Sequence, residues 1–390
     1  MGIDVSKGKS TVAIMRPSGE VVAEPFEVSH TDAELKKLAC FLEKLPGETR
    51  IVMEYTGSYW QPIAKVLHDA GLFVSVVNAL LIYKYGNNSI RKGKTDKLDA
   101  VKIANCCLDR WSDLECYAPA DQIRQTLKTC RRQYDQYINL KVNLKNKLIL
   151  LLDGTFPGIN TLFKSAYRDI DGHEKWVDFA EKFWHCECVC GSSEKAFTNQ
   201  YRKWCDKAGY RFSMEKAVAI YTYASSQVNT LPMIDAIKCF ITHAVAQLNT
   251  IIETIPEIQH EMLTLASQLP EYPIVMRMFG VGPVLGPQLM AEIGDVRRFH
   301  RKQFAGVDAP PCQSGTFKSK NRHISKRGSP RLRKTLFQVM STIIQHAPTD
   351  DPVFQFLDRK RQEGNVYMTA AANKFLRIYY GTVMAYLEKL

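Results

Sequence analysis

The first 28 residues, MGIDVSKGKSTVAIMRPSGEVVAEPFEV, contain three short runs that are typical of β-strands. The runs cover residues 3–6, 11–15 and 21–28, and each contains the β-branched residues that strands favour. Pro17-Ser18-Gly19 separates the second run from the third, and proline and glycine both favour tight turns. The stretch therefore predicts an antiparallel meander of three strands.

Helices and strands alternate over the next eighty residues. Thr31-Asp32-Ala33-Glu34 has the pattern of a capping box, in which the Thr31 and Glu34 side chains satisfy the first free amides of a helix that runs to about Leu45. We further expect strands at 50–55 and 72–77 and helices at 62–70 and 96–108. This order of elements is that of a ribonuclease-H-like α/β domain, which we place at residues 1–118.

Two long segments in the middle of the chain carry apolar residues at alternating steps of four and three. They lie at 123–151 and 237–269, and this spacing is typical of a coiled-coil seam. Pro256 should kink the second helix because proline removes a backbone donor. The predicted coiled-coil region, 119–270, contains an insertion at 153–235 and precedes a mainly helical C-terminal domain at 271–390. The fold class is therefore α/β plus α.

Composition excludes several classes of protein. The 390 residues are 45% hydrophobic and 24% charged, which is ordinary for a soluble globular chain and argues against disorder. No apolar run is as long as a bilayer span, and the start lacks the basic and apolar regions of a secretory signal. We therefore predict a cytoplasmic protein with no membrane partner.

Cysteine usage fits a reducing compartment. The chain has 11 cysteines without the spacing of a disulfide framework, so we expect free thiols that serve mainly as small core residues. Cys186, Cys188 and Cys190 alternate after His185. A zinc site usually shows paired cysteines with two-residue gaps, so alternate cysteines on one face of a buried strand are the favoured interpretation, and metal binding by this cluster stays open.

Most of the net charge of +12 comes from one segment. Between Asp295 and Lys334 there are twelve Lys or Arg residues and two acids. Such a block indicates a surface for nucleic-acid phosphates, and a solvated basic loop is the alternative. The candidate contacts are Arg297, Arg298, Lys318, Lys320, Arg322, Lys326, Arg327, Arg331 and Arg333.

A glycine pair precedes the basic block. Gly280-Val281-Gly282 lies between a helical stretch at 274–279 and a helix that we expect to begin at Pro283. Such a hairpin can bring backbone amides up to a DNA phosphate, so Gly280 and Gly282 are further candidate contacts. A plain interhelical turn explains the same residues nearly as well.

Four acids fall at element ends of the predicted α/β domain. Asp4 lies in the first strand and Glu54 near the end of a later one, while Asp96 and Asp99 share one face at the start of a helix. An all-oxygen ligand set favours Mg²⁺, which assists phosphoryl transfer. Each acid alone has a simpler explanation as a cap or a solvated residue, so only their joint placement indicates a metal site.

Asp4 also allows a phosphate-binding interpretation. Actin-like ATPases bind phosphate with an aspartate on the first strand, and Gly2-Ile3-Asp4 fits that pattern loosely. The sequence shows no second Asp-Gly-Gly-type phosphate loop, which argues against this interpretation.

Several of these motifs together resemble a known family. They are Gly2-Ile3-Asp4-Val5-Ser6-Lys7, Met53-Glu54-Tyr55-Thr56-Gly57, Lys94-Thr95-Asp96-Lys97-Leu98-Asp99-Ala100, Gly280-Val281-Gly282, Gln313-Ser314-Gly315, Ile324-Ser325-Lys326-Arg327-Gly328 and Arg331-Leu332-Arg333. The chain resembles, over residues 1–152 and 236–390, the DEDD transposases of the insertion-sequence-110 type, which are recombinases guided by a bridge RNA. Phe279 departs from the proline usual in that family, and the insertion at 153–235 matches nothing we can name.

The resemblance implies a function and its residues. Asp4, Glu54, Asp96 and Asp99 would bind Mg²⁺ in a RuvC-like domain, and Ser314 would attack a DNA phosphate to form a covalent phosphoserine linkage. The partners it implies are donor and target DNA, a bridge RNA and further copies of the chain, from dimer to tetramer, associated with the bacterial nucleoid. The alternatives are a RuvC-like nuclease, such as a junction resolvase, that uses activated water, and a non-catalytic nucleic-acid scaffold.

Overall fold

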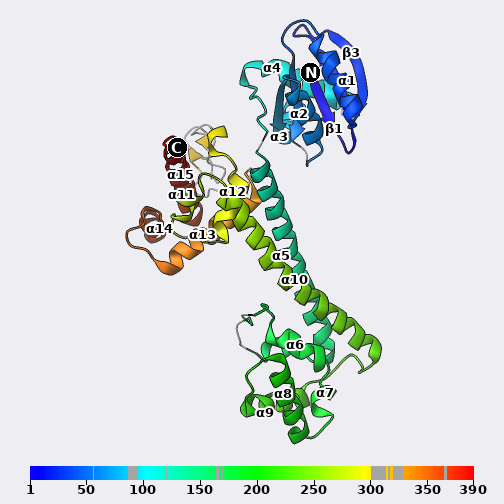
Figure 1. Cartoon of the computed structure of the whole chain (residues 1–390), viewed down its shortest axis with the longest axis vertical. Coiled ribbons are helices and arrows are strands. Elements are labelled where there is room, and N and C mark those ends of the chain that lie inside the picture. The colour runs from blue at the N-terminus through cyan, green and yellow to red at the C-terminus, as the bar shows by residue number, and fades with distance from the viewer. Residues whose placement is uncertain are drawn as a thin grey trace. The chain divides into compact units, whose positions relative to one another are not determined.

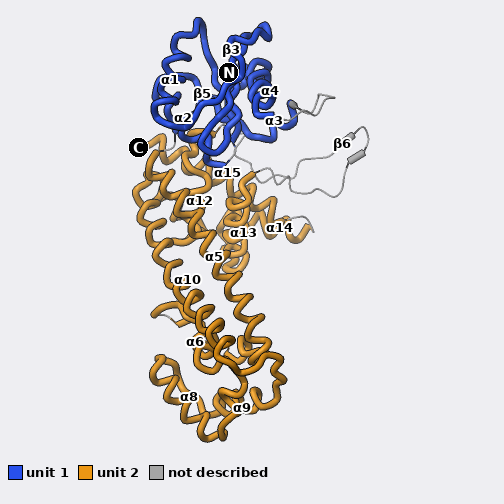
Figure 2. Tube along the Cα trace, turned by 90° about the vertical axis from the view of Figure 1, so that its right-hand side faces the viewer, with its two compact units in different colours: residues 1–119 blue, residues 120–390 orange. Residues whose placement is uncertain are grey.

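The chain forms two compact units, residues 1–119 and residues 120–390 (Figure 2). The computed structural model describes residues 1–55, 57–86, 95–119, 121–163, 167–168, 170–299, 313–314, 317–318, 328–363 and 367–390. The first unit is a mixed α/β sheet domain and the second is mostly helical, which confirms the predicted combination of an α/β part with a helical remainder.

The sheet of the first unit has the strand order β3-β2-β1-β4-β5. Its strands are β1 (Gly2–Val5), β2 (Lys9–Met15), β3 (Val21–Ser29), β4 (Arg50–Tyr55) and β5 (Phe73–Asn78). The first three strands pair antiparallel, as the predicted meander requires, whereas β4 pairs parallel with β1 and β5 parallel with β4. A parallel pair needs a crossover, and helices supply each one here.

Helices cover both faces of this sheet. The helices of the first unit are α1 (Asp32–Glu43), α2 (Trp60–Asp69), α3 (Ala79–Gly86), α4 (Asp96–Asp109) and the short 3₁₀ helix η1 (Trp111–Asp113). One face packs against α1 and α2 through a core that includes Ile3, Met53 and Leu38. The other face packs against α3 and α4, where Val52 meets Ile82 and Ile103. Helix α3 was not among the elements predicted from the sequence.

Gly2 marks the closest approach between the sheet and α4. A Cβ atom at Gly2 would collide with backbone atoms of Ala100 and Ala104. The thiol of Cys107, one turn further along α4, donates to the carbonyl of Arg50 at 3.9 Å, at the start of β4. Helix α4 therefore runs antiparallel to β1, with its first turn towards the carboxyl end of that strand.

We expect Gly2→Ala to destabilise the first unit by about 3 kcal/mol, because backbone atoms of α4 cannot move aside without shifting the whole helix. Thermal or urea unfolding followed by circular dichroism measures this. Gly381→Ala, at a helical glycine with open space around it, is the matched control and should stabilise the chain by up to about 1 kcal/mol. Unchanged unfolding of Gly2→Ala would contradict the close packing of α4 on β1.

Two long helices form the spine of the second unit (Figure 1). They are α5 (Gln122–Thr155) and α10 (Asp235–Ser267). Leu127 near the start of α5 shares a core with Met262 near the end of α10, and Leu148 shares another with Ile241. The two helices therefore run antiparallel, and α10 continues through Pro256.

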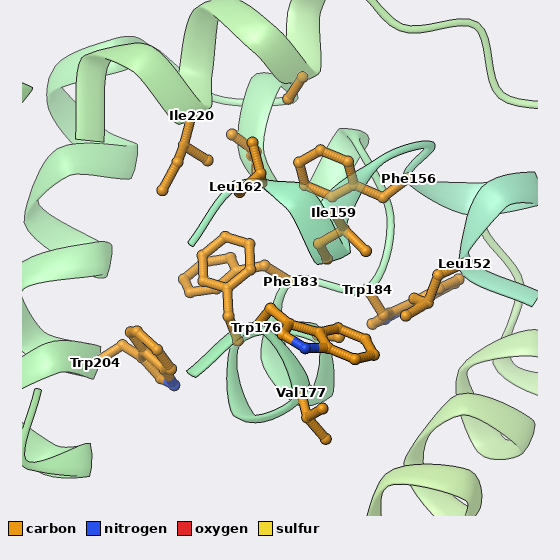
Figure 3. Close-up of a cluster of buried hydrophobic side chains, with 14 of the residues drawn as sticks. Leu152, Phe156, Ile159, Leu162, Trp176, Val177, Phe183, Trp184, Trp204 and Ile220 are labelled. Carbon is orange, nitrogen blue, oxygen red and sulfur yellow. The ribbon is translucent and has the colours of Figure 1, made fainter. Parts of the chain in front are cut away.

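The insertion, which lies between α5 and α10 in the sequence, forms a small helical body. Its helices are the 3₁₀ helix η2 (Ile159–Thr161), α6 (Lys175–Lys182), α7 (Glu187–Cys190), α8 (Glu194–Ala208) and α9 (Met214–Ser226). Aromatic side chains fill its core (Figure 3). The Phe179 and Phe183 rings stack with their centres 4.7 Å apart, and the Trp204 ring packs edge-on against Phe183 with 6.3 Å between the ring centres. Such pairs stabilise the fold beyond the area they bury.

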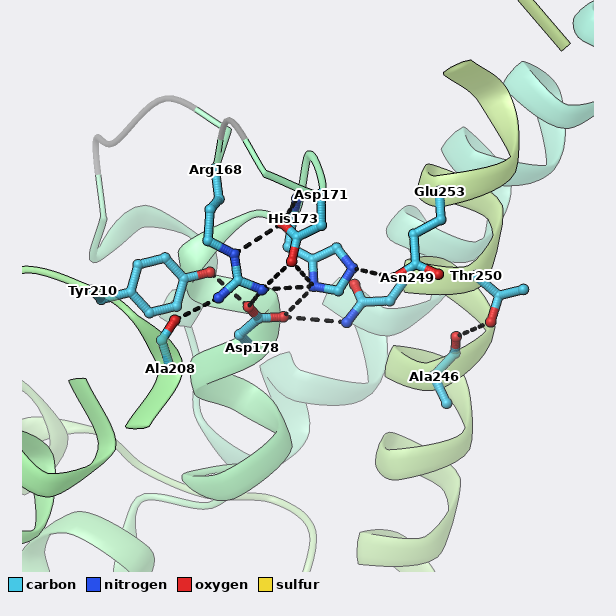
Figure 4. Close-up of polar contacts among 10 residues, drawn as sticks. All are labelled: Arg168, Asp171, His173, Asp178, Ala208, Tyr210, Ala246, Asn249, Thr250 and Glu253. Carbon is cyan, nitrogen blue, oxygen red and sulfur yellow. Dashed lines mark hydrogen bonds and ion pairs between the residues drawn. The ribbon is translucent and has the colours of Figure 1, made fainter. Parts of the chain in front are cut away.

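A polar network ties the insertion to α10 (Figure 4). Asp178 of α6 accepts hydrogen bonds from the Tyr210 hydroxyl at 2.6 Å and from the Asn249 amide at 3.2 Å. The Nδ1 atom of His173 lies 3.3 Å from a carboxylate oxygen of Asp178, and its Nε2 atom lies 3.2 Å from a carboxylate oxygen of Glu253. Asn249 and Glu253 belong to α10, so the carboxylate of Asp178 fixes the insertion against this helix.

The C-terminal helices pack around the other end of the spine. They are α11 (Tyr272–Met276), α12 (Leu285–Ile293), the 3₁₀ helix η3 (Val296–Arg298), α13 (Pro330–His346), α14 (Pro352–Gln362) and α15 (Tyr367–Leu387). Leu127 and Ala266 of the spine share a core with Leu289, Val339 and Tyr379. Within the part of the chain that the structure describes, no helix combines the length and the apolar character needed to cross a membrane.

A buried ion pair joins the spine to this helical region. Arg124 of α5 and Glu271, just before α11, make a bidentate contact, and their side chains are only 5% and 2% exposed. Asp121 also contacts the Arg124 guanidinium, at 2.8 Å, from a half-exposed position. Removing one partner of a buried pair leaves the other charge without its counter-ion, which is strongly unfavourable.

We expect Glu271→Gln to lower the free energy of unfolding of the second unit by about 3 kcal/mol, at the low end for buried pairs because Asp121 still contacts Arg124. Urea denaturation measures this effect. Lys360→Gln, which removes the more exposed Lys360–Glu363 pair, is the control and should cost at most about 1 kcal/mol. Equal midpoints for the two variants would show that the buried pair does not hold these elements together.

Candidate functional site

Asp4 and Glu54 lie on the same face of the sheet. On β1, Ile3 points into the core beneath α1 and α2, whereas Gly2 faces α4. Side chains alternate along a strand, so Asp4 is on the α4 side. On β4, Met53 belongs to the core of Ile3 and Val52 to that of α4, which places Glu54 on the α4 side too.

The strand pairing brings these two acids to neighbouring positions. Strands β1 and β4 are parallel with Ile3 opposite Met53, so the next residues, Asp4 and Glu54, follow at the carboxyl ends of adjacent strands. Both side chains are half-buried. The carboxyl edge of a parallel strand pair is where open α/β sheets most often bind ligands.

The first turn of α4 brings two more acids towards this edge. Thr95 caps the helix, because its hydroxyl accepts a hydrogen bond from the Leu98 amide at 3.2 Å. Because α4 runs antiparallel to β1, Asp96 and Asp99 in this turn lie towards the strand ends. Asp96 is exposed, and Asp99 forms an ion pair with Lys102 at 2.9 Å.

The charges around this edge influence one another. The hydrogen bond from Lys9 to Glu27 raises the pKa of Lys9, and the negative charge of Asp96 adds to the effect. Asp96 therefore lies near the start of β2 as well as the end of β1. Among the residues that the structure describes, however, no three His, Cys, Asp or Glu side chains are close enough together to hold a metal ion. The four acids share one edge of the domain without forming a closed cage.

Ser314 belongs to a small hairpin in the second unit. Strands β6 (Gln313–Ser314) and β7 (Phe317–Lys318) pair antiparallel, with Ser314 opposite Phe317. The hairpin contains the predicted contact Lys318. The other candidates in this stretch, Lys320, Arg322, Lys326 and Arg327, lie outside the described residues.

Three of the candidate arginines have partners within the protein. Arg297 pairs with Asp295 at 2.7 Å, and Arg298 donates to the Ile293 carbonyl at 2.9 Å. Arg331 pairs with Asp135 of α5 at 3.0 Å while its side chain stays 48% exposed. These contacts hold the arginines in place, so their role is partly structural.

Arg333 lies in a different environment. It lines a surface hollow of about 430 Å³ along α13 together with Lys334, Phe337 and Gln338. Lys334 is exposed and was not among the contacts predicted from the sequence. Two cations beside an aromatic ring in a hollow suit a phosphate group and its neighbouring base.

Gly280 has a structural role in the turn between α11 and α12. Its φ is +77°, and a Cβ atom there would lie 2.9 Å from the Ile343 side chain and 3.1 Å from the Val339 carbonyl. Gly282 has open space around it. Glycine is thus required at Gly280 by the backbone conformation and by close packing on α13.

The helices beside this turn differ from the prediction. Helix α11 ends at Met276 and not at 279, and α12 begins at Leu285 and not at Pro283. Two glycines and a proline within four residues disfavour helix, so the connection is longer than expected. Helix α11 covers residues 272–276, so only the first half of the predicted helix at 274–279 is helical.

The cysteine cluster belongs to a helical turn, so its predicted placement on a strand was wrong. Cys186, Cys188 and Cys190 lie at or within α7. Burial raises the pKa of Cys186 to about 12, which keeps the thiol neutral. His185 accepts a hydrogen bond from the Glu187 amide through Nδ1, and its Nε2 lies 3.1 Å from the Leu231 carbonyl. These contacts occupy both ring nitrogens and favour the core interpretation of the cluster.

Two family models match the chain. The first is a DEDD transposase model of the IS110 type, described as "Transposase", and it matches residues 1–157. The second is described as "Transposase IS116/IS110/IS902 family" and matches residues 272–355. The first match covers the sheet and the four acids, and the second covers Ser314 and the basic block. Residues 158–271, with most of the insertion, lie outside both matches.

A curated protein is similar to the chain along nearly its whole length. It is the "Insertion element IS116 uncharacterized 44.8 kDa protein" of Streptomyces clavuligerus. The two are 23% identical over 381 residues, which are 95% of this chain and 90% of the relative. Together with the two family models, and with an α/β sheet followed by a mostly helical remainder, this shows that the chain belongs to the IS110-type transposase family.

Proposed function

We propose that the chain mobilises its own insertion sequence by RNA-guided cleavage and exchange of DNA strands through a covalent phosphoserine intermediate. The observation that carries this proposal is the gathering of Asp4, Glu54 and the first turn of α4 at one edge of the sheet in a transposase of this family. Asp4 and Glu54 are half-buried at the ends of adjacent strands, where two negative charges repel each other unless a cation or a proton offsets them.

The topology supports the proposed domain types. The order β3-β2-β1-β4-β5, with three antiparallel strands followed by two parallel ones, supports a ribonuclease-H-like or RuvC-like domain in the first unit. The antiparallel packing of α5 and α10 along apolar seams supports the coiled-coil interpretation of the spine. The segment from 271 onwards, with Ser314, is proposed as the transposase domain.

The acidic edge is the proposed Mg²⁺ site. Asp4, Glu54, Asp96 and Asp99 offer only carboxylate oxygens, which are the ligands that Mg²⁺ prefers. When bound, Mg²⁺ would offset the negative charge that develops on the phosphate during phosphoryl transfer. The chain's own contribution is to hold Asp4 and Glu54 on rigid strands and the other two acids on a capped helix.

Ser314 is the proposed nucleophile. Its Oγ would attack a DNA phosphate, forming a phosphoserine ester and releasing a deoxyribose hydroxyl. The corresponding hydroxyl of the exchanged strand would then attack the phosphoserine, which regenerates Ser314 and rejoins the DNA. One phosphoester bond replaces another at each step, so no external energy source is needed. Arginine and lysine side chains of the basic block would offset the charge on the phosphoryl oxygens.

The proposed partners are nucleic acids and further copies of the chain. A bridge RNA would select donor and target DNA by base pairing, while the protein contacts backbone and shape. Exposed cations such as Lys334, together with Arg333, are suited to phosphate contacts. A homo-oligomer, from dimer to tetramer, would hold the two DNA partners together, associated with the nucleoid in the bacterial cytoplasm.

Removing divalent metal tests the proposed function. The chain purified from cells that carry its gene with the native flanking DNA should cleave and join that DNA with Mg²⁺ present. Excess EDTA should reduce the yield of joined product at least about a thousandfold, and added Mg²⁺ should restore it. Product formation in EDTA at the rate seen with Mg²⁺ would contradict the proposed role of the acidic edge.

A further inference from the structure

A pocket of about 570 Å³ lies in the insertion, lined by residues of η2, α6 and α9 and the segment after η2. Its lining includes two aromatic residues, Phe163 and Tyr223, and two lysines, Lys175 and Lys216. This volume is within the range of small-ligand sites. None of these residues belongs to the acidic edge or to the basic block.

Two lysines share one aromatic ring in this pocket. The Nζ atom of Lys175 lies 5.3 Å from the centre of the Phe163 ring, and the Nζ atom of Lys216 lies 5.4 Å from the same centre. Both distances are within the range of cation–π attraction. The ring therefore fixes two positive charges beside one cavity.

Lys175 is half-buried and lies among aromatic side chains. Tyr210 and Tyr201 lie 5.1 and 5.7 Å from its Nζ atom, which donates to the Arg211 carbonyl at 3.2 Å. Among the described residues, no carboxylate forms an ion pair with Lys175. Burial lowers the pKa of Lys175, and the positive charge of Lys216 lowers it further. An anion placed beside both lysines would offset the repulsion between them and favour the charged form of Lys175.

The walls of the pocket select among anions. The Tyr223 ring stacks on the Phe156 ring, with 6.4 Å between the ring centres and 24° between the ring planes. This contact holds the Tyr223 ring in place. Phe163 is similarly fixed by its edge-on contact with Phe179 at 5.2 Å. A flat ring attached to a phosphate would use the aromatic walls and the lysines together, and bases stack well on such side chains. An acidic peptide would use only the lysines.

We propose that this pocket binds a nucleotide of single-stranded nucleic acid, with its phosphate beside Lys175 and Lys216 and its base against Phe163 or Tyr223. The insertion would then be an additional nucleic-acid-binding module on the transposase. This inference rests on the proposed function only in that the chain acts on DNA and RNA.

Photocrosslinking tests the pocket in the unaltered full-length chain. Ten-nucleotide single strands containing 5-iodouridine, as RNA, or 5-iododeoxyuridine, as DNA, are irradiated with the protein, and crosslinked peptides are mapped by mass spectrometry. We expect crosslinks at Phe163 or Tyr223. Their presence with RNA, with DNA or with both supports the proposal and identifies the natural source of the nucleotide. Absence of crosslinks in the insertion with both strands overturns it.

Paired charge variants provide an independent measurement. Lys175→Gln with Lys216→Gln should weaken binding of whichever strand crosslinks about tenfold and reduce its salt dependence. Lys195→Gln with Lys207→Gln removes the same charge from exposed positions on α8 and should have little effect. Equal affinities for the two double variants would overturn the proposal. Neither assay involves strand cleavage, so a failure of the Ser314 mechanism would leave both results interpretable.

Discussion

The chain with Glu54→Gln is expected to lose DNA cleavage and strand joining by at least about a thousandfold, which corresponds to about 4 kcal/mol of transition-state stabilisation. The glutamine keeps the size of the side chain at the end of β4 but removes the negative charge beside Asp4. Magnesium prefers charged oxygen ligands, so its binding should weaken as well. Cleavage and joining of the native flanking DNA, followed at several Mg²⁺ concentrations, measures both effects.

Glu48→Gln is the matched control for this variant. Glu48 lies just before the start of β4, at the end of the strand opposite to Glu54. It is mostly exposed and pairs with Arg50 at 2.7 Å. This variant should retain full activity. Both variants should unfold at the temperature of the unaltered chain. If Glu54→Gln cleaved DNA normally with Mg²⁺ present, the proposed metal site would be wrong.

Ser314→Ala should abolish excision and insertion while leaving DNA binding intact. The alanine removes only the hydroxyl that would form the phosphoserine bond. A polymerase chain reaction across the empty donor site and the new junction detects each product in cells. Ser319→Ala should behave like the unaltered chain, because no role is proposed for that serine. A RuvC-like nuclease that uses water would instead cleave DNA equally well with either substitution.

Local sequence signals were sufficient for much of the first unit. The helix predicted at 96–108 is α4 at Asp96–Asp109, and the strand predicted at 21–28 is β3 at Val21–Ser29. Both succeed because their signals are local: Thr95 caps α4 with its own side chain, and turn residues precede β3. The placement of four acids near one edge could be inferred from this order of elements. Their actual separation could not, because it depends on how closely α4 approaches the sheet.

Contacts between residues far apart in the sequence determine the features that could not be predicted from it. The cysteines at 186–190 alternate like a strand, yet they form the turn α7 because Val189 is buried in the aromatic core of the insertion. Arg331 could be assigned to a charged block but not to its partner Asp135, which lies 196 positions earlier. The proposed role of Ser314 rests on the family resemblance alone, because no local pattern distinguishes it from other loop serines.

The proposed mechanism requires that a serine of this chain becomes covalently joined to DNA. Cells that carry the gene with its native flanking DNA would express either the unaltered chain or Ser314→Ala, and denaturing gels would be examined for protein attached to DNA. We predict an adduct with the unaltered chain that disappears with Ser314→Ala. Cleaved DNA without any adduct, in equal amounts for both chains, would contradict the phosphoserine mechanism and indicate a nuclease that uses activated water.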